Sequence, residues 1–197
     1  LNLEIFQNEV TVLLGKNGAG KTTTMNLITG ICSPTKGHVY VNGYDSSTQT
    51  SYARETMFLC PQDNIFIREF TVYEQLKFFA QLKGRFEESI GDDVGKMLRL
   101  LEMEQFINHL PHKLSGGTKR KLALAISLIG RSSIVILDEP TSGLDPNSCR
   151  AVWNTLTTLR KDKTILFTTH NMEEADYLGN RIIILNNGTI KYDGTPD

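Results

Sequence analysis

Residues 10–24 read Val-Thr-Val-Leu-Leu-Gly-Lys-Asn-Gly-Ala-Gly-Lys-Thr-Thr-Thr. The first five of these residues are mostly apolar and predict a short buried strand. The glycines at 15, 18 and 20 then predict a tight turn that leads into a helical pattern. A strand, a glycine-rich loop and a helix are therefore expected to follow one another here, and the rest of the chain is organised around them.

This loop matches the pattern Gly-x-x-x-x-Gly-Lys-Ser/Thr, in which backbone amides bind phosphate. Glycines allow a positive φ and leave no Cβ between the amides and an anion, and the helix adds its positive N-terminal end. Lys21 is expected to reach the β- and γ-phosphates of a nucleotide, and the Thr22 hydroxyl to ligate a bridging Mg²⁺. The residues predicted to bind the nucleotide in this loop are Gly15, Asn17, Gly18, Ala19, Gly20, Lys21, Thr22 and Thr23.

The composition is that of an ordinary globular protein. A length of 197 residues is enough for one well-buried core. The formal net charge of −1 provides no overall basic field, so we expect no nucleic-acid partner. The three cysteines are far apart and form no Cys-x-x-Cys pair, which favours reduced thiols over a disulfide framework or a zinc site.

No apolar run approaches the roughly 18 residues that a membrane-spanning helix needs, and no signal peptide opens the chain. Any connection to a membrane is therefore expected to come from a partner or from another part of the same polypeptide. The start at Leu1 and the stop at Gly-Thr-Pro-Asp are typical of a domain cut from a longer protein.

Apolar strand patterns alternate with helical patterns over much of the chain. A half-buried strand is expected at residues 1–5, buried strands at 57–60, 134–137 and 165–167, and a hairpin at 182–192 around Asn186-Asn187-Gly188. This alternation predicts an α/β fold with a mostly parallel sheet. With the phosphate loop at residues 15–22, the pattern is typical of the P-loop NTPase type.

A long helical stretch interrupts the alternation. Thr71 and Glu74 have the spacing of a capping box, and apolar stripes follow at residues 72–80 and 94–101. We predict a single ATP-binding domain over residues 1–197, with an α/β core at about 1–63 and 118–197 and an inserted helical subdomain at about 64–117.

Three polar residues predict further helix starts. Asp145 precedes Pro146, and Asn171 with Glu174 has the spacing of a helix cap. Ser115 is a suitable N-cap, but Gly116 and Gly117 follow it, and two glycines in a first helical turn lower stability. They indicate that another group approaches this backbone closely. A second helix end that faces phosphate suggests a nucleotide shared between two domains.

Asp138 and Glu139 close the most apolar strand of the chain, where the carboxyl ends of strands line the ligand crevice of an α/β sheet. Two adjacent carboxylates are costly to desolvate unless a cation or a substrate needs them. Asp138 suits a supporting role beside Mg²⁺, and Glu139 could polarise an attacking water. The alternative is a pair of acids that simply faces solvent.

Taken together, these motifs resemble those of the nucleotide-binding domain of an ABC transporter. The matches are the Walker A loop at residues 15–22, the Q-loop Gln62, the signature motif at 114–118, Walker B with the catalytic glutamate at 134–139, the D-loop at 142–145 and the switch His170. All of them occur in the family's order, and the resemblance spans nearly the whole chain.

The resemblance implies two such domains facing each other head to tail. ATP would lie between the Walker A loop of one domain and Ser115 and Gly117 of the other, with Asp145 also at the nucleotide. The implied catalytic residues are Glu139, His170 and Gln62, and the implied Mg²⁺ site comprises Thr22, Gln62 and Asp138. Closure on ATP and opening after hydrolysis would move transmembrane domains, so we expect a membrane-associated domain at the cytoplasmic face.

In detail the motifs are most similar to the A subfamily of eukaryotic transporters, in which both halves lie in one long chain and the cargo is typically lipid. Two features depart from the family pattern. Thr118 stands where the signature commonly has glutamine, and Phe6 is too close to the loop to be the family's adenine-stacking aromatic. Thr118 affects how strongly the signature motif can bind its side of the nucleotide. Because Phe6 cannot stack on adenine, no residue here accounts for selectivity for the base.

Two other functions are compatible with the motifs. One is a regulatory half that closes on ATP but hydrolyses it weakly, and the other is a soluble ABC-type ATPase of DNA repair or translation. The histidines outside the motifs, His38, His109 and His112, are interpreted as surface or structural residues.

Overall fold

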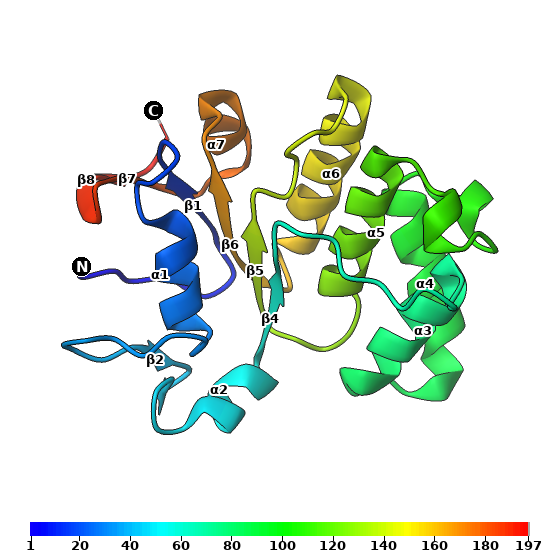
Figure 1. The fold of residues 1–197 in the computed structure, drawn as a ribbon, viewed down its shortest axis with the longest axis horizontal. Helices are drawn as coiled ribbons and strands as arrows, with labels where there is room; N and C mark the ends of the chain where they lie inside the picture. Colours follow the sequence, from blue (N-terminus) through cyan, green and yellow to red (C-terminus); the bar gives the residue numbers. More distant parts are fainter. Residues whose placement is uncertain (197) are drawn as a thin grey trace. The chain divides into compact units, whose positions relative to one another are not determined.

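The structure is a computed structural model that describes residues 1–196, so Asp197 of the predicted domain lies outside the described residues. The chain divides into two compact units (Figure 1). The first unit comprises residues 1–59, 132–139 and those from 160 onward. The second comprises residues 60–131 and 140–159.

A six-stranded sheet with the order β4-β5-β6-β1-β7-β8 forms the centre of the first unit. Its strands are β1 (Val10–Leu14), β4 (Met57–Cys60), β5 (Ile134–Asp138), β6 (Thr164–Thr169), β7 (Arg181–Asn186) and β8 (Thr189–Gly194). β1 pairs in parallel with β6 and β7, β5 pairs in parallel with β6, and β8 returns antiparallel to β7. The mostly parallel α/β sheet predicted from the sequence is confirmed.

The central strands of this sheet are mostly apolar and buried, so the sheet forms the core of the first unit. Every residue of β1 is buried, as expected of a parallel strand covered on both faces. The remaining elements of the first unit are the helices α1 (Lys21–Ile28), α2 (Thr50–Glu55) and α7 (Met172–Leu178), and a small antiparallel pair, β2 (Tyr40–Val41) with β3 (Tyr44–Asp45). Leu13 of β1, Met25 of α1 and Ile136 of β5 belong to one buried apolar cluster.

The structure contradicts the strand predicted at residues 1–5, which form no strand. Leu3 and Ile5 nevertheless pack, partly buried, against the core cluster. Alternation of apolar and polar residues reports which side chains face the core, whereas a strand also requires backbone hydrogen bonds to a neighbour. His38 lies two residues before β2 begins, outside any strand.

The second unit is helical. Its elements are α3 (Val72–Leu82), α4 (Glu87–Leu100), α5 (Gly116–Leu128), α6 (Pro146–Leu159) and the short 3₁₀ turns η1 (Glu104–Phe106) and η2 (Pro111–Lys113). The predicted capping box is confirmed: Thr71 Oγ1 accepts from the Glu74 N–H, and a Glu74 carboxylate oxygen accepts from the Thr71 N–H.

Apolar faces hold these helices together. α3 packs against α4 and α5, and α6 packs against α4 and α5. The Thr155 hydroxyl of α6 also donates to the Leu100 carbonyl at the end of α4, at 2.9 Å. The predicted helical subdomain, about 64–117, lies inside this unit, which extends further to include the rest of α5 and α6. Among the described residues, no helix has the length and apolar character required to span a bilayer.

Candidate functional site

The phosphate loop, residues 15–22, connects β1 to α1. Gly18 and Gly20 have φ values of +80° and +104°, a region that favours glycine, and Gly20 is the N-cap of α1. The buried Lys21 side chain turns back over the loop, and its Nζ donates to the Gly15 carbonyl at 2.6 Å and the Lys16 carbonyl at 3.4 Å. The loop thus places an ammonium group beside backbone at the N-terminus of a helix.

Neighbouring strands hold this loop in place. The Gly15 N–H donates to the Thr169 carbonyl of β6 at 3.2 Å, and the Gly188 N–H donates to the Ala19 carbonyl at 2.9 Å. A Cβ at position 15 would lie 2.7 Å from the Leu185 carbonyl oxygen, so only glycine fits there without a shift of backbone. β6 and the turn between β7 and β8 therefore both support the phosphate loop.

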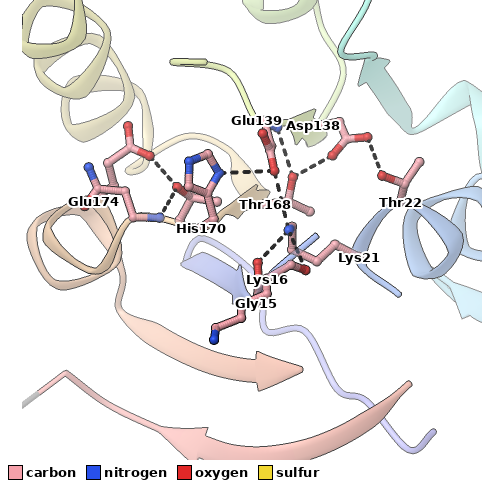
Figure 2. Close-up of polar contacts among 11 residues, drawn as sticks. Gly15, Lys16, Lys21, Thr22, Asp138, Glu139, Thr168, His170 and Glu174 are labelled. Carbon is pink, nitrogen blue, oxygen red and sulfur yellow. Dashed lines mark hydrogen bonds and ion pairs between the residues drawn. The ribbon is translucent and has the colours of Figure 1, made fainter. Parts of the chain in front are cut away.

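Asp138, the last residue of β5, holds two hydroxyl groups and is 5% exposed. Thr22 Oγ1 donates to Asp138 Oδ2 at 3.0 Å, and Thr168 Oγ1 donates to Asp138 Oδ1 at 2.6 Å (Figure 2). The carboxylate is therefore aimed at the first turn of α1. Hydroxyl and carboxylate oxygens are the hard ligands that Mg²⁺ prefers.

Glu139 lies at the centre of the polar contacts in Figure 2. One carboxylate oxygen, Oε1, lies 3.4 Å from Lys21 Nζ and 3.4 Å from His170 Nδ1. The backbone of Glu139 has a φ of +45°, which is unusual for a residue other than glycine, and its N–H donates to Thr168 Oγ1 at 2.9 Å. Strained backbone of this kind is concentrated at functional sites.

His170 follows directly after β6, and its side chain is 60% exposed. The residues on either side of it are tied together: the Thr169 hydroxyl donates to a Glu174 carboxylate oxygen at 2.5 Å and accepts from the Asn171 N–H at 3.0 Å. Glu174 is 3% exposed. The predicted pairing of Asn171 and Glu174 in a cap of α7 is therefore wrong for Glu174, while Asn171 Oδ1 does cap the helix by accepting from the Glu173 N–H.

Five predicted site residues thus lie together within the first unit: Lys21, Thr22, Asp138, Glu139 and His170. The other predicted site residues outside the phosphate loop belong to the second unit, namely Gln62, Ser115, Gly117 and Asp145.

Ser115 begins helix α5 as predicted. Its Oγ accepts from the Thr118 N–H at 3.2 Å and lies 2.9 Å from the Thr118 hydroxyl. A Cβ added at Gly117 would lie 3.5 Å from Leu144, an ordinary contact distance, so packing in this chain alone does not require glycine at that position. The unusual Thr118 therefore contacts the hydroxyl of the signature serine directly.

Asp145 begins α6, and Gln62 lies on an irregular loop after β4. Asp145 Oδ1 accepts from the N–H groups of Asn147 and Ser148 at 3.0 and 3.1 Å. A hydrogen bond from the Ser148 side chain, with these backbone bonds, holds the pKa of Asp145 below its usual value. The Asp145 carboxylate therefore accepts from the first N–H groups of α6.

The oxygen groups of Thr22 and Asp138 suit a Mg²⁺ ion bound together with a nucleotide better than a metal ion held by protein side chains alone. Within residues 1–196 there is no group of three or more His, Cys, Asp or Glu side chains that could hold a metal ion. Thr22 and Asp138 offer one hydroxyl and one carboxylate, and Mg²⁺ commonly takes one or two protein oxygens together with phosphate oxygens and water.

Sequence reasoning missed three residues. Thr168 links Asp138 to the Glu139 N–H, Glu174 supports the backbone around His170, and Arg120 donates to backbone carbonyls near Gln62. None belongs to a motif that binds phosphate. No sequence pattern marked these contacts in advance.

The chain is similar to known ABC proteins. A family model described as ABC transporter matches residues 1–142. The chain is 46% identical over 195 residues to the phospholipid-transporting ATPase ABCA3 of Mus musculus, covering 99% of this chain and 11% of that protein. It is 44% identical over 196 residues to the retinal-specific phospholipid-transporting ATPase ABCA4 of Homo sapiens, covering 100% of this chain and 9% of that protein. The chain therefore spans only about a tenth of the length of these relatives.

Solved structures agree with this assignment. An ATP-binding subunit of an ABC transporter superposes with a TM-score of 0.89 at 29% identity, covering 98% of this chain and 81% of that chain. A dimeric ATP-binding cassette in a post-hydrolysis state, bound to ADP and Pi, superposes with a TM-score of 0.88 at 27% identity, covering 100% and 89%. The chain therefore belongs to the ABC transporter family, as an ABC-type ATPase domain whose similar relatives include members of the A subfamily.

Proposed function

We propose that this chain is the ATP-binding and ATP-hydrolysing motor domain of a transporter that moves lipid across a membrane. The observation that carries the proposal is the position of Glu139 Oε1, which lies 3.4 Å from both Lys21 Nζ and His170 Nδ1. A carboxylate held between a phosphate-loop lysine and a histidine is suitable as a general base. The two relatives described above, both phospholipid-transporting ATPases, support lipid as the cargo.

Each residue of the site has a distinct role in this proposal. The Lys21 ammonium and the amides of residues 15–23 would bind and orient the phosphates. Thr22 and Asp138 would hold a Mg²⁺ ion, which would neutralise phosphate charge. Glu139 accepts a proton from the attacking water. His170 and Lys21 hold the Glu139 carboxylate in position, and the Thr168 hydroxyl holds the backbone of Glu139 by accepting from its N–H.

The complete site requires a second domain. Ser115, Gly117 and Asp145 of one domain would face the phosphate loop of the other in a head-to-tail pair, and Gln62 would complete the Mg²⁺ site. The dimeric cassette bound to ADP and Pi supports pairing of this kind. The second domain and the transmembrane domains would come from the parent chain, with this domain at the cytoplasmic face of the membrane.

The test is ATP hydrolysis by the reconstituted parent protein, comparing wild type with Glu139→Gln at saturating Mg-ATP. Loss of a general base lowers rates by about 10² to 10⁴, so we expect slow turnover with ATP binding retained. Glu173→Gln, which changes an exposed acid at the start of α7, is the matched control and should hydrolyse ATP normally.

Two results would redirect the proposal. Equal, slow hydrolysis by wild type and Glu139→Gln would identify a regulatory domain that closes on ATP without turning it over. A parent protein without membrane-spanning segments would identify a soluble ABC-type ATPase.

A further inference from the structure

Arg120, in the second turn of α5, is 4% exposed and donates to carbonyl oxygens of two separate loops. Its Nε donates to the Pro140 carbonyl at 3.1 Å. Its Nη1 donates to the Pro61 carbonyl at 2.8 Å and the Gln62 carbonyl at 2.9 Å, and also lies 3.4 Å from Asn64 Oδ1. All of these residues belong to the second unit.

The loops that Arg120 holds are irregular. Residues 61–64 and residue 140 lie in neither a helix nor a strand, so their carbonyls lack the regular partners that secondary structure provides. A guanidinium is planar and points its N–H groups in fixed, diverging directions, so it sets the direction of each carbonyl as well as its distance. Arg120 therefore holds the carbonyls of two loops that no regular secondary structure fixes.

Both loops adjoin residues of the proposed mechanism. Gln62 is itself one of the residues held, and Pro140 is joined by a peptide bond to Glu139. The helix that carries Arg120, α5, is capped at its N-terminus by Ser115, the signature residue. We infer that Arg120 is a positioning residue that ties the loop of Gln62 and the loop after Glu139 to the signature helix. The roles of Gln62 and Glu139 in this inference rest on the proposed function.

Lys83 provides a matched comparison within the same unit. Its Nζ donates to the carbonyls of Ile126 and Ser127 near the C-terminal end of α5. Lys83 is thus a second cation that holds backbone carbonyls, but these carbonyls belong to no predicted site residue. Lys83→Met should lower stability without a specific effect on the site, and it serves as the control for loss of a structural cation.

The first experiment is hydrogen exchange on the nucleotide-free parent protein. Arg120→Lys keeps the charge but cannot reproduce the diverging N–H groups, and Arg120→Met removes both. We expect the Leu144 amide, which donates to the Thr141 carbonyl, and the Ile67 amide, which donates to Gln75 Oε1, to exchange about tenfold faster in both variants, because local opening of the two loops becomes easier. Lys83→Met should leave those amides unchanged. This measurement does not depend on hydrolysis.

The second experiment separates positioning from stability. In the parent protein, Arg120→Lys should lower kcat on the order of 10- to 100-fold, since a small displacement of catalytic groups has effects of this size. It should also raise the Mg²⁺ concentration needed for half-maximal rate, while KM for ATP changes by less than about twofold. Lys83→Met should lower the melting temperature and keep kcat.

Folded Arg120 variants with wild-type exchange in both loops would overturn the inference, as would folded variants with wild-type kcat and Mg²⁺ dependence. If Arg120→Met does not fold, hydrogen exchange and kinetics of Arg120→Lys still test the inference. If wild type hydrolyses no ATP, the proposed function fails, and the exchange rates still decide whether Arg120 positions these loops.

Discussion

Lys21 Nζ lies 3.4 Å from Glu139 Oε1, so the ammonium group of the phosphate loop and the carboxylate after β5 form an ion pair. The side chains are 6% and 14% exposed, and salt screens charges in such places less than charges at the surface. Removing one partner leaves the other charge poorly solvated. Removing either charge therefore alters the electrostatic surroundings of the other, even without bound nucleotide.

We expect Lys21→Met to weaken ATP binding by about ten- to a hundredfold, because a hydrogen bond to a charged group contributes about 1.5 to 3 kcal/mol. Titration of the parent protein with a fluorescent ATP analogue measures the change. Lys36→Met removes an exposed lysine from a loop of the same unit and should leave the affinity unchanged. Equal affinity of Lys21→Met and wild type would show that Lys21 does not hold phosphate.

Two buried threonines of the central sheet should respond in opposite ways to the loss of a hydroxyl. Thr168→Val removes one hydroxyl donor from Asp138 and the acceptor of the Glu139 N–H, and it should lower the free energy of unfolding by about 1 to 3 kcal/mol. The Thr11 hydroxyl is buried without a hydrogen-bond partner, so Thr11→Val should be neutral or raise it by about 1 kcal/mol.

Proteolysis of the parent protein in increasing urea compares the two valine variants directly. Because both threonines lie in neighbouring strands, β6 and β1, a general effect of valine on the sheet would appear in both variants alike. Similar midpoints for Thr168→Val and Thr11→Val would contradict the role given to Thr168.

Glu174→Gln should lower kcat more than it changes KM, because it weakens the hydrogen bond that fixes Thr169 next to His170. Hydrogen bonds to an ionised acceptor are roughly twice as strong as those between neutral groups, so about 1 kcal/mol of stability should also be lost. Steady-state ATPase rates and melting temperatures test both effects. The neighbouring Glu173→Gln, at an exposed position, should show neither.

The pKa of Asp145 is lowered first by the Ser148 side chain and then by backbone N–H groups. A folded-state pKa below the unfolded value of about 3.9 adds stability that is present above about pH 3.9 and is lost as the pH falls through the folded pKa. Wild type should therefore be more stable than Asp145→Asn at neutral pH, and the difference should shrink below about pH 4.

Urea midpoints of the parent protein at about pH 7, 5 and 3.5 measure this difference. Ser148→Ala removes the side-chain bond and should shift the pKa of Asp145 upward, so its stability should begin to fall at a higher pH than that of wild type. An Asp145→Asn variant whose deficit is the same at every pH would show that Asp145 does not titrate in the folded state as described.

Local chemistry made much of this fold predictable. The strand, glycine loop and helix of residues 10–24 and the capping box at Thr71 and Glu74 depend on neighbours within a few residues, and both form as expected. The buried strands at 134–137 and 165–167 were predictable for the same reason, because apolar runs of this kind mark buried strands, although β5 extends one residue further, to Asp138, and β6 two residues further, to Thr169.

The errors arose where a distant partner decides the outcome. Residues 1–5 have the alternation of a strand, but pairing depends on a neighbouring edge that no local pattern encodes. Glu174 has the spacing of a helix cap, but its carboxylate instead accepts a hydrogen bond from the hydroxyl of Thr169, which lies in the preceding strand. The contacts of Thr168 and Arg120 join segments far apart in sequence, so their partners became visible only in the fold.

The hydrogen bond from the Gly188 N–H to the Ala19 carbonyl has a consequence for synthesis on the ribosome. β1 leaves the ribosome before its partners in the sheet, β6 and β7, and before the turn that supports the phosphate loop. The nascent chain must therefore carry an apolar strand with unpaired edges until nearly the whole domain has emerged, which exposes it to aggregation and to chaperones. The phosphate loop therefore gains its support from the β7–β8 turn only after translation has passed Gly188.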